Sequence, residues 1–165
     1  MAKLNLCCGD DVRPGYINID VRKTKPSVLV LDLEKELLSP FPDNSVDEII
    51  ARDCIEHVSW RRVEDLLKDM FRVLKCGGRV YIQVPDLEAI AKKVILNPDF
   101  CYANLCGWKA ISFWVYGAQD YPENVHKAGF TIPTLKRLLE SMGFKVETIQ
   151  NDGGTNIICW AVKKC

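Results

Sequence analysis

The sequence predicts an α/β protein with a doubly wound, mostly parallel sheet. Short β-rich runs that end in small or acidic residues fill the first third of the chain, and helix and strand patterns alternate after them. A glycine-rich turn joins the last two β-rich runs. The 165 residues, 48% apolar and 27% charged, suffice for one buried core, so we expect a single domain spanning residues 1–165.

Four of these runs, over residues 3–7, 16–20, 28–31 and 46–51, are predicted to be the first strands. About eight residues separate the first two and about seven the second and third, whereas a parallel crossover usually takes a dozen or more. The N-terminal half is therefore predicted to have reduced helices. One end of the sheet would then be thinly covered, and either the segment 97–130 or a second subunit of a homodimer would cover it.

Helix and strand signals alternate in the rest of the chain. Apolar residues recur every three to four positions from Val63 to Leu74, which predicts an amphipathic helix with Ser59 as its N-cap and Gly77-Gly78 as its stop. The later elements are, in order, a strand over 80–84, a helix from the Asp86 cap to about Leu96, a helix from the Thr131 cap to Gly143, and strands over 144–149 and 155–162. The turn 151–154 predicts that the last two strands are antiparallel neighbours, whereas the segment 97–130 is predicted to be irregular.

Charge and hydropathy exclude several classes of protein. The 22 basic residues balance the 22 acidic ones, so the chain carries no clear nucleic-acid signal. No apolar stretch approaches the roughly 20 residues of a membrane-spanning helix. The first residues run directly into strand-like sequence without a secretory leader, and we expect a cytoplasmic protein.

The eight cysteines are unevenly spaced, and several lie in apolar runs, so they are predicted to be buried thiols. The pair Cys101 and Cys106 is the one weak metal-like spacing, and there is no C-x-x-C motif. The sequence therefore predicts no metal site.

The first strand runs into a turn of small residues, Cys7-Cys8-Gly9, which allows a ligand to approach the backbone closely. A dinucleotide-binding G-x-G-x-x-G motif would need glycine at 7, 9 and 12, but positions 7 and 12 are Cys7 and Val12. A pyrophosphate is therefore disfavoured. A nucleoside without phosphates makes fewer demands on this loop.

Acidic residues follow the next three strands. Asp20 is placed to accept hydrogen bonds from both hydroxyls of a ribose. Asp32 is placed to accept from an adenine amino group while the Leu33 N–H donates to a ring nitrogen, although Asp32 alternatively caps the turn 33–38. Asp53 is predicted either to contact the same ligand or to form a turn.

In combination, these motifs resemble those of class I S-adenosylmethionine-dependent methyltransferases over nearly the whole chain. The matching segments are Leu4-Asn5-Leu6-Cys7-Cys8-Gly9, Asn18-Ile19-Asp20, the stretches 41–47 and 54–58, and the helix-to-strand turn 73–80. The resemblance implies a Rossmann-like sheet of seven strands in the order 3-2-1-4-5-7-6 with the last strand antiparallel. It also implies S-adenosylmethionine as the cofactor.

The predicted cofactor-binding residues are Leu6, Cys7, Cys8, Gly9, Asp20, Asp32, Leu33, Asp53 and Cys54. Two positions depart from the family pattern: Cys7 stands where glycine is most common, and Cys76 where proline is usual. The side chain of Cys7 near the methionine end of the cofactor would crowd it or require a shifted backbone.

The stretch 116–127 is rich in groups that hydrogen-bond or exchange protons, and we expect it to form the acceptor site. Its predicted substrate-binding residues are Tyr116, Gln119, Asp120, Asn124 and His126. His126 is the first choice for a catalytic base and His57 the second. The alternatives are that His126 fixes its own loop through a backbone hydrogen bond and that His57 orients the cofactor loop.

The balanced charge, the compact frame and the lack of an appended binding module favour methyl transfer to a small-molecule, sugar or other metabolite acceptor. Two other functions stay open from the sequence. One is a non-catalytic S-adenosylmethionine-binding or scaffold subunit, suggested by Cys7 and the missing crossover helices. The other is an NAD-dependent oxidoreductase of similar topology, which the incomplete glycine motif disfavours.

Overall fold

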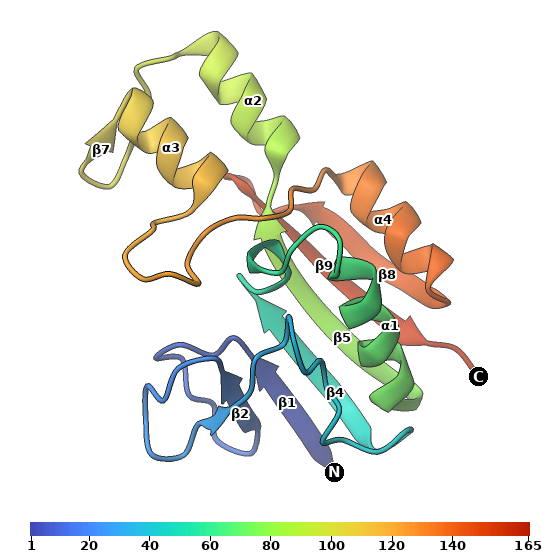
Figure 1. Cartoon of the computed structure of the whole chain (residues 1–165). Coiled ribbons are helices and arrows are strands. Elements are labelled where there is room, and N and C mark those ends of the chain that lie inside the picture. Colours follow the sequence, from blue (N-terminus) through green and yellow to red (C-terminus); the bar gives the residue numbers. More distant parts are fainter.

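A computed structural model describes all 165 residues as one seven-stranded sheet in the order β3-β2-β1-β4-β5-β9-β8 (Figure 1). The strands are β1 (Ala2–Leu6), β2 (Ile17–Asp20), β3 (Leu29–Val30), β4 (Val46–Arg52), β5 (Leu74–Pro85), β8 (Phe144–Asn151) and β9 (Asn156–Lys163). The first five are parallel, and β9 is antiparallel to both β5 and β8. The predicted fold class and strand order are confirmed.

The first predicted helix is α1 (Val63–Val73), which buries Val63, Leu67 and Met70 among its apolar residues. Its predicted ends are wrong. Arg62 is the N-cap, while the Ser59 carbonyl accepts from the N–H groups of Arg62 and Val63 and so forms the turn that leads in. The helix ends before Gly77-Gly78, because Leu74 takes an extended conformation and starts β5 at once.

The other two predicted helices are α2 (Leu87–Leu96) and α4 (Ile132–Ser141). The Asp86 carboxylate accepts from the first-turn N–H groups of Glu88 and Ala89, and Thr131 forms a capping box with Thr134. Both predicted caps are confirmed.

No helix lies between β1 and β4, as the short spacings predict. A buried amide pair holds the β1–β2 connection in place of a helix. The Asn18 Oδ1 accepts from Asn5 Nδ2 at 2.9 Å and from the Arg13 N–H at 2.8 Å, and Asn18 Nδ2 donates to the carbonyls of Arg13 and Tyr16. Every polar atom of the Asn18 side chain is thereby satisfied away from water.

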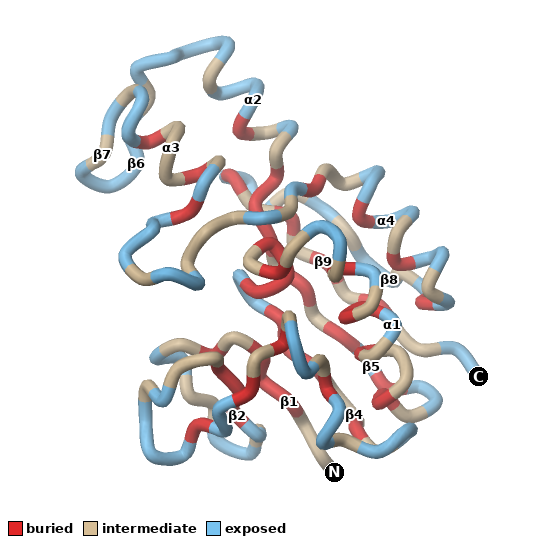
Figure 2. Tube along the Cα trace, viewed as in Figure 1, coloured by how far each residue is buried: buried red, intermediate tan, exposed pale blue.

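Helices α1 and α4 lie on the same face of the sheet, and the buried residues run along the strands beneath them (Figures 1 and 2). The rings of Tyr81 on β5 and Trp160 on β9 are partly exposed and pack against each other, with 5.1 Å between their centroids. None of the helices is long and apolar enough to cross a bilayer. Coverage of the sheet by a second subunit stays a prediction.

The segment 97–130 is more regular than predicted. It contains a hairpin of β6 (Cys101–Tyr102) and β7 (Leu105–Cys106), followed by the helix α3 (Trp108–Tyr116). These elements stand with α2 beyond the end of β5 rather than over the sheet (Figure 1). The helix was missed because its run of apolar residues has no amphipathic period.

The prediction that all the cysteines are thiols is wrong for six of them. Disulfides join Cys7 to Cys54, Cys76 to Cys165 and Cys101 to Cys106, and only Cys8 and Cys159 are free and buried. Because Cys101 and Cys106 are bonded to each other, neither offers a thiolate to a metal ion. Burial raises the pKa of the Cys8 thiol to about 11 and of the Cys159 thiol to about 12, so both are protonated at neutral pH.

We expect the protein, purified without reductant and unfolded in denaturant, to react with iodoacetamide at Cys8 and Cys159 only. Intact-mass measurement counts the added groups, and prior reduction supplies the control with every cysteine labelled. Labelling of all eight cysteines without reduction would contradict the three disulfides.

Replacing Asn18 by alanine is expected to lower the free energy of unfolding by about 1–3 kcal/mol, because it leaves Asn5 and the Arg13 N–H without their buried acceptor. Denaturant titration measures the change. Asn104→Ala is the control, since Asn104 is exposed and its side chain makes no hydrogen bond within the chain. Equal stability of the two variants would show that the amide network does not support the crossover.

Candidate functional site

A cavity of about 400 Å³ lies at the edge of the sheet where β1, β2, β3 and β4 end. Parallel strands bring their carboxyl ends to one edge, so residues distant in sequence meet there. Three stretches form most of the wall: 31–35 after β3, 53–58 after β4, and 121–127 from the segment predicted to bind an acceptor. The volume is in the range of small-molecule binding sites.

Most of the predicted cofactor residues line this cavity. Those that do are Cys7, Gly9, Asp20, Asp32, Leu33, Asp53 and Cys54. Leu6 and Cys8 are buried outside the lining. The sequence missed Val21, Leu31, Glu34, Lys35 and Val58, which carry no motif and reach the wall only because their strands end there.

Asp20 is the best-anchored acid of the site. It is 6% exposed, and its Oδ2 accepts from the Gly9 N–H at 2.8 Å while Oδ1 accepts from the Arg22 N–H at 2.9 Å. These bonds hold the carboxylate rigidly against the first turn. Each oxygen keeps a second lone pair, so the carboxylate can still accept hydrogen bonds from a ligand.

Asp32 and Leu33 lie on the same wall. The Asp32 Oδ1 accepts from the N–H groups of Glu34 and Lys35, so this residue does cap the following turn, as the alternative interpretation has it. Burial by itself would raise the pKa of Asp32. The hydrogen bonds from Lys35 and Glu34 outweigh this effect and hold the pKa below its usual value. The N–H of Leu33 has no acceptor within the chain and remains available to a ligand.

Cys7 and Cys54 form the floor of the cavity. They follow the neighbouring strands β1 and β4, and their disulfide joins the two strand ends. Cys7 has a φ of +50°, a left-handed conformation that favours glycine. This conformation explains why glycine suits the position, and the sulfur of Cys7 is bonded to Cys54 rather than free.

Two hydrogen bonds fasten the predicted acceptor segment to the loop after β4. The backbone carbonyl of Glu56 accepts from the N–H groups of Lys127 at 2.7 Å and Ala128 at 3.1 Å. The segment turns back at Gly117, where a Cβ would lie 2.7 Å from the Asn124 carbonyl and where φ is +83°. Only glycine fits there without a shift of the chain.

None of the five predicted substrate residues is in the cavity wall, and His126 lies behind His57. Tyr116, Gln119, Asp120 and Asn124 lie outside the wall and bond within their own turn, where Gln119 N–H donates to the Asn124 carbonyl and Asn124 Nδ2 to Asp120. The wall is instead formed by Tyr121, Pro122, Glu123 and Lys127. The segment thus reaches the cavity, but through residues other than the predicted ones, because a loop has no period from which to read direction. Its role as acceptor site stays a prediction.

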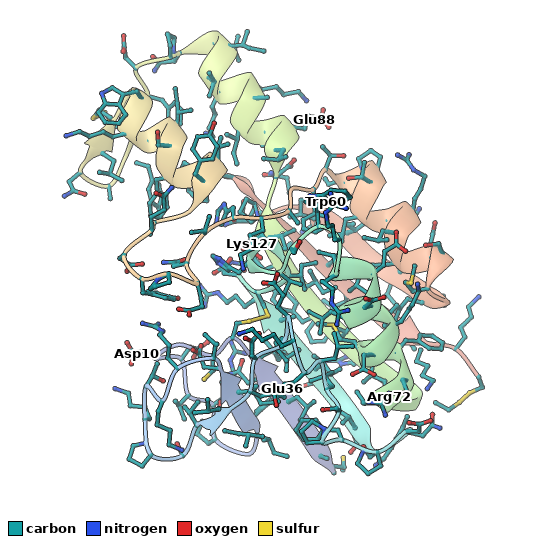
Figure 3. All side chains as sticks on the ribbon, viewed as in Figure 1. Asp10, Glu36, Trp60, Arg72, Glu88 and Lys127 are labelled. Carbon is teal, nitrogen blue, oxygen red and sulfur yellow. A yellow bond between two sulfur atoms is a disulfide. The ribbon has the colours of Figure 1, made fainter.

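Two side-chain contacts hold this segment across the cavity. The Arg22 guanidinium stacks 3.4 Å from the centroid of the Tyr121 ring, a cation–π contact. Lys127 Nζ lies 2.6 Å from Glu34 Oε2, so an ion pair joins the acceptor segment to the loop after β3. Lys127 is labelled in Figure 3. Both bridges tie the two sides of the cavity together.

The chain's two histidines meet beside the cavity. His57 lines it, and the His126 ring packs edge-on against His57 with 5.1 Å between centroids. Burial and the charge of nearby His126 lower the pKa of His57 to about 4, and burial lowers the pKa of His126. His57 is therefore neutral at pH 7. His126 also makes the backbone hydrogen bond of the alternative interpretation, through Nδ1 to the Trp114 carbonyl at 3.1 Å.

Asp53, which follows β4, also lines the cavity. It takes a φ of +48°, and Gln83 Nε2 donates to its Oδ1 at 3.1 Å. Loss of hydration raises the pKa of its carboxyl. Asp53 therefore forms a turn and also lines the cavity, and its contact with the ligand stays a prediction.

Comparison with known proteins agrees with this arrangement. Residues 4–82 match a family model described as a methyltransferase domain. Over 62 residues the chain is 34% identical to phosphoethanolamine N-methyltransferase 2 of Caenorhabditis elegans, which is 38% of this chain but 14% of that protein. The chain thus matches only a small part of this curated relative.

Solved structures are similar over nearly the whole chain. An S-adenosylmethionine-dependent methyltransferase from Archaeoglobus fulgidus is 16% identical with a TM-score of 0.66, covering 98% of this chain and 86% of that one. One from Mesorhizobium loti is 14% identical with a TM-score of 0.67, covering 98% and 90%. The Burkholderia thailandensis 1,6-didemethyltoxoflavin-N1-methyltransferase, solved with bound 1,6-didemethyltoxoflavin and S-adenosylhomocysteine, is 15% identical with a TM-score of 0.63, covering 99% and 72%.

The sheet order is that of the class I S-adenosylmethionine-dependent methyltransferase fold. Residues 4–82, just under half of the chain, are similar to a methyltransferase domain. The NAD-dependent alternative has no support in these comparisons.

Asp20→Ala is expected to weaken S-adenosylmethionine binding by about 1–3 kcal/mol, the scale of a lost hydrogen bond to a charged group. Calorimetric titration measures the affinity. Asp10→Ala is the control, because Asp10 is exposed in the same loop and lies outside the cavity lining. An unchanged affinity of Asp20→Ala would contradict the ribose assignment.

Proposed function

We propose that this domain transfers the methyl group of S-adenosylmethionine to a nitrogen or oxygen atom of a small molecule, a sugar or another metabolite. The methyl carbon forms a bond to the acceptor atom as its bond to sulfur breaks, which leaves S-adenosylhomocysteine. The acceptor gives up its proton. The observation that carries the proposal is a single cavity with cofactor-type acids on one wall and the acceptor segment on the other.

The strand-end residues form the proposed cofactor half. Asp20 would accept from the ribose hydroxyls, since its carboxylate is fixed and has free lone pairs. The unpaired Leu33 N–H would donate to an adenine ring nitrogen, with Asp32 beside it. Cys7 and Cys54 would lie under the ligand at the floor.

The opposite wall favours a small acceptor. Tyr121 and Lys127 are each bridged to the far side of the cavity, by Arg22 and by Glu34. A polymer would have to break these bridges to reach the floor, whereas a metabolite fits within about 400 Å³. Two similar proteins, a phosphoethanolamine N-methyltransferase and a 1,6-didemethyltoxoflavin-N1-methyltransferase, are also named for small acceptors.

Positioning supplies most of the proposed rate enhancement. Transfer from a sulfonium requires the acceptor atom in line with the sulfur–methyl bond, and the walls of the cavity limit the directions from which the acceptor can approach. His57 faces the cavity and is neutral at pH 7, so its ring can accept a hydrogen bond from the acceptor. His126 packs behind it and orients it. Both predicted catalytic histidines thus keep a role in the proposal.

His57→Ala and His126→Ala are expected to lower turnover by about 10²–10⁴ fold, the usual contribution of a positioned acid–base group. Their affinity for S-adenosylmethionine should stay near that of the wild type. S-adenosylhomocysteine formation is measured with pools of small amines, alcohols and sugars, and Lys109→Ala, an exposed change on α3, is the control.

Full activity of both histidine variants would rule out their catalytic role. Saturable cofactor binding with no methyl transfer to any pool would instead favour the non-catalytic S-adenosylmethionine-binding or scaffold subunit.

A further inference from the structure

Beside the cavity, three side chains with metal-binding atoms converge. Glu56, His57 and His126 each offer one donor atom, and these atoms lie within 4.8 Å of one another. Glu56 and His57 come from the short helix after β4 (Ile55–His57), and His126 comes from the acceptor segment. The Glu56 carbonyl, which accepts from the N–H groups of Lys127 and Ala128, brings the two segments together.

Both imidazoles have the protonation state that a metal ligand needs. His57 Nδ1 lies 3.2 Å from the Val125 carbonyl, and His126 Nδ1 lies 3.1 Å from the Trp114 carbonyl. A carbonyl oxygen only accepts, so each Nδ1 carries the proton and each Nε2 carries a free lone pair. Metal-bound histidines are typically oriented by such a hydrogen bond from the second ring nitrogen.

Glu56 supplies an independent observation. The residue is 1% exposed, and its Oε2 is buried without a hydrogen-bond partner. A buried carboxyl group with an unpartnered oxygen destabilises the fold unless a compensating group is bound. No Lys or Arg forms an ion pair with it. A cation between the carboxylate and the two imidazoles would satisfy that oxygen.

We propose that Glu56, His57 and His126 form a binding site for a divalent first-row transition metal ion of the zinc type. Two imidazole nitrogens and one carboxylate oxygen are a ligand set used by catalytic zinc and non-haem iron centres, which leave a position open for substrate. Ligand bonds of about 2.0–2.2 Å hold neighbouring donor atoms within roughly 4 Å, so small side-chain movements close the site.

The ligand set disfavours Mg²⁺ and Ca²⁺, because these ions prefer all-oxygen coordination. His57 is both a ligand and part of the cavity wall, so the open position would lie next to the bound acceptor. An acceptor oxygen or nitrogen that binds there is oriented toward the cofactor, and a metal-bound hydroxyl loses its proton more readily. In the metal-loaded protein this coordination replaces the hydrogen bond from the acceptor to His57.

The test is a titration of the protein, produced without a histidine tag, with Co²⁺ in the absence of cofactor and acceptor. One Co²⁺ per chain with visible absorption bands, displaced by Zn²⁺ but not by Mg²⁺, is the expected result. Because neither S-adenosylmethionine nor turnover enters the measurement, its failure is separate from a failure of the proposed methyl transfer.

Glu56→Gln and His126→Ala are each expected to weaken Co²⁺ and Zn²⁺ binding by at least about tenfold, since even losing a hydrogen-bond partner behind a ligand costs that much. Glu147→Gln is the matched control, because Glu147 is exposed on β8 and far from any ion pair. Thermal melting and S-adenosylmethionine binding confirm that each variant is folded.

Three outcomes would overturn the site. The first is no saturable Co²⁺ binding by the wild type. The second is Co²⁺ binding by both ligand variants that is as tight as that of the wild type. The third is a sulfur-to-cobalt charge-transfer band, which would place the metal on Cys8 or Cys159 instead.

Discussion

The backbone carbonyl of Glu56 holds the two halves of the site together. Its hydrogen bonds to the N–H groups of Lys127 and Ala128 connect the loop after β4 with a segment about 70 residues later. They place His126 against His57 and direct Lys127 toward Glu34. Without these bonds, the wall formed by residues 121–127 would lose its backbone link to the loop after β4. Backbone bonds suit this task, because they fix the chain whatever side chains the wall carries.

The N-terminal half shows how a sheet can dispense with crossover helices. Where a helix would satisfy its own backbone, the β1–β2 connection depends on Asn5, Asn18 and the Asp20 carboxylate for partners. Asp20 therefore stabilises the first turn and faces the cavity at the same time. A short connection has few polar side chains, so it is rigid only if some of them stabilise the backbone and face the cavity at the same time. The effects of an Asp20 substitution on ligand binding and on folding are therefore hard to separate.

The resemblance to class I methyltransferases predicted the sheet order, whereas β-rich runs, helix periods and the final glycine turn predicted most of the individual elements from local signals. They also predicted that Asp20, Asp32 and Asp53 share one edge. What they did not predict depends on contacts between distant segments. The helix α3 lacks an amphipathic period, and the inward-facing residues Tyr121 and Lys127 are set by partners on other loops.

The two histidines show the same limit. They are 69 positions apart, and neither belongs to a spacing that indicates a metal site. Only the adjacency of β4 and the acceptor segment places them together with Glu56. The cysteine pairs were missed for a related reason: Cys7 and Cys54 come together because β1 and β4 are neighbours in the sheet, which no cysteine spacing reveals.

The floor of the cavity combines backbone strain with a covalent link. Cys7 and Asp53 both take left-handed conformations, at φ of +50° and +48°, and such residues cost about 1–3 kcal/mol each. The Cys7–Cys54 bond closes a loop with a sequence separation of 47, which stabilises the fold by about 4 kcal/mol in the loop-closure description. The two effects are of similar size. The cross-link thus offsets the strain of sharp turns after β1 and β4, and a cysteine can occupy a position whose backbone conformation favours glycine.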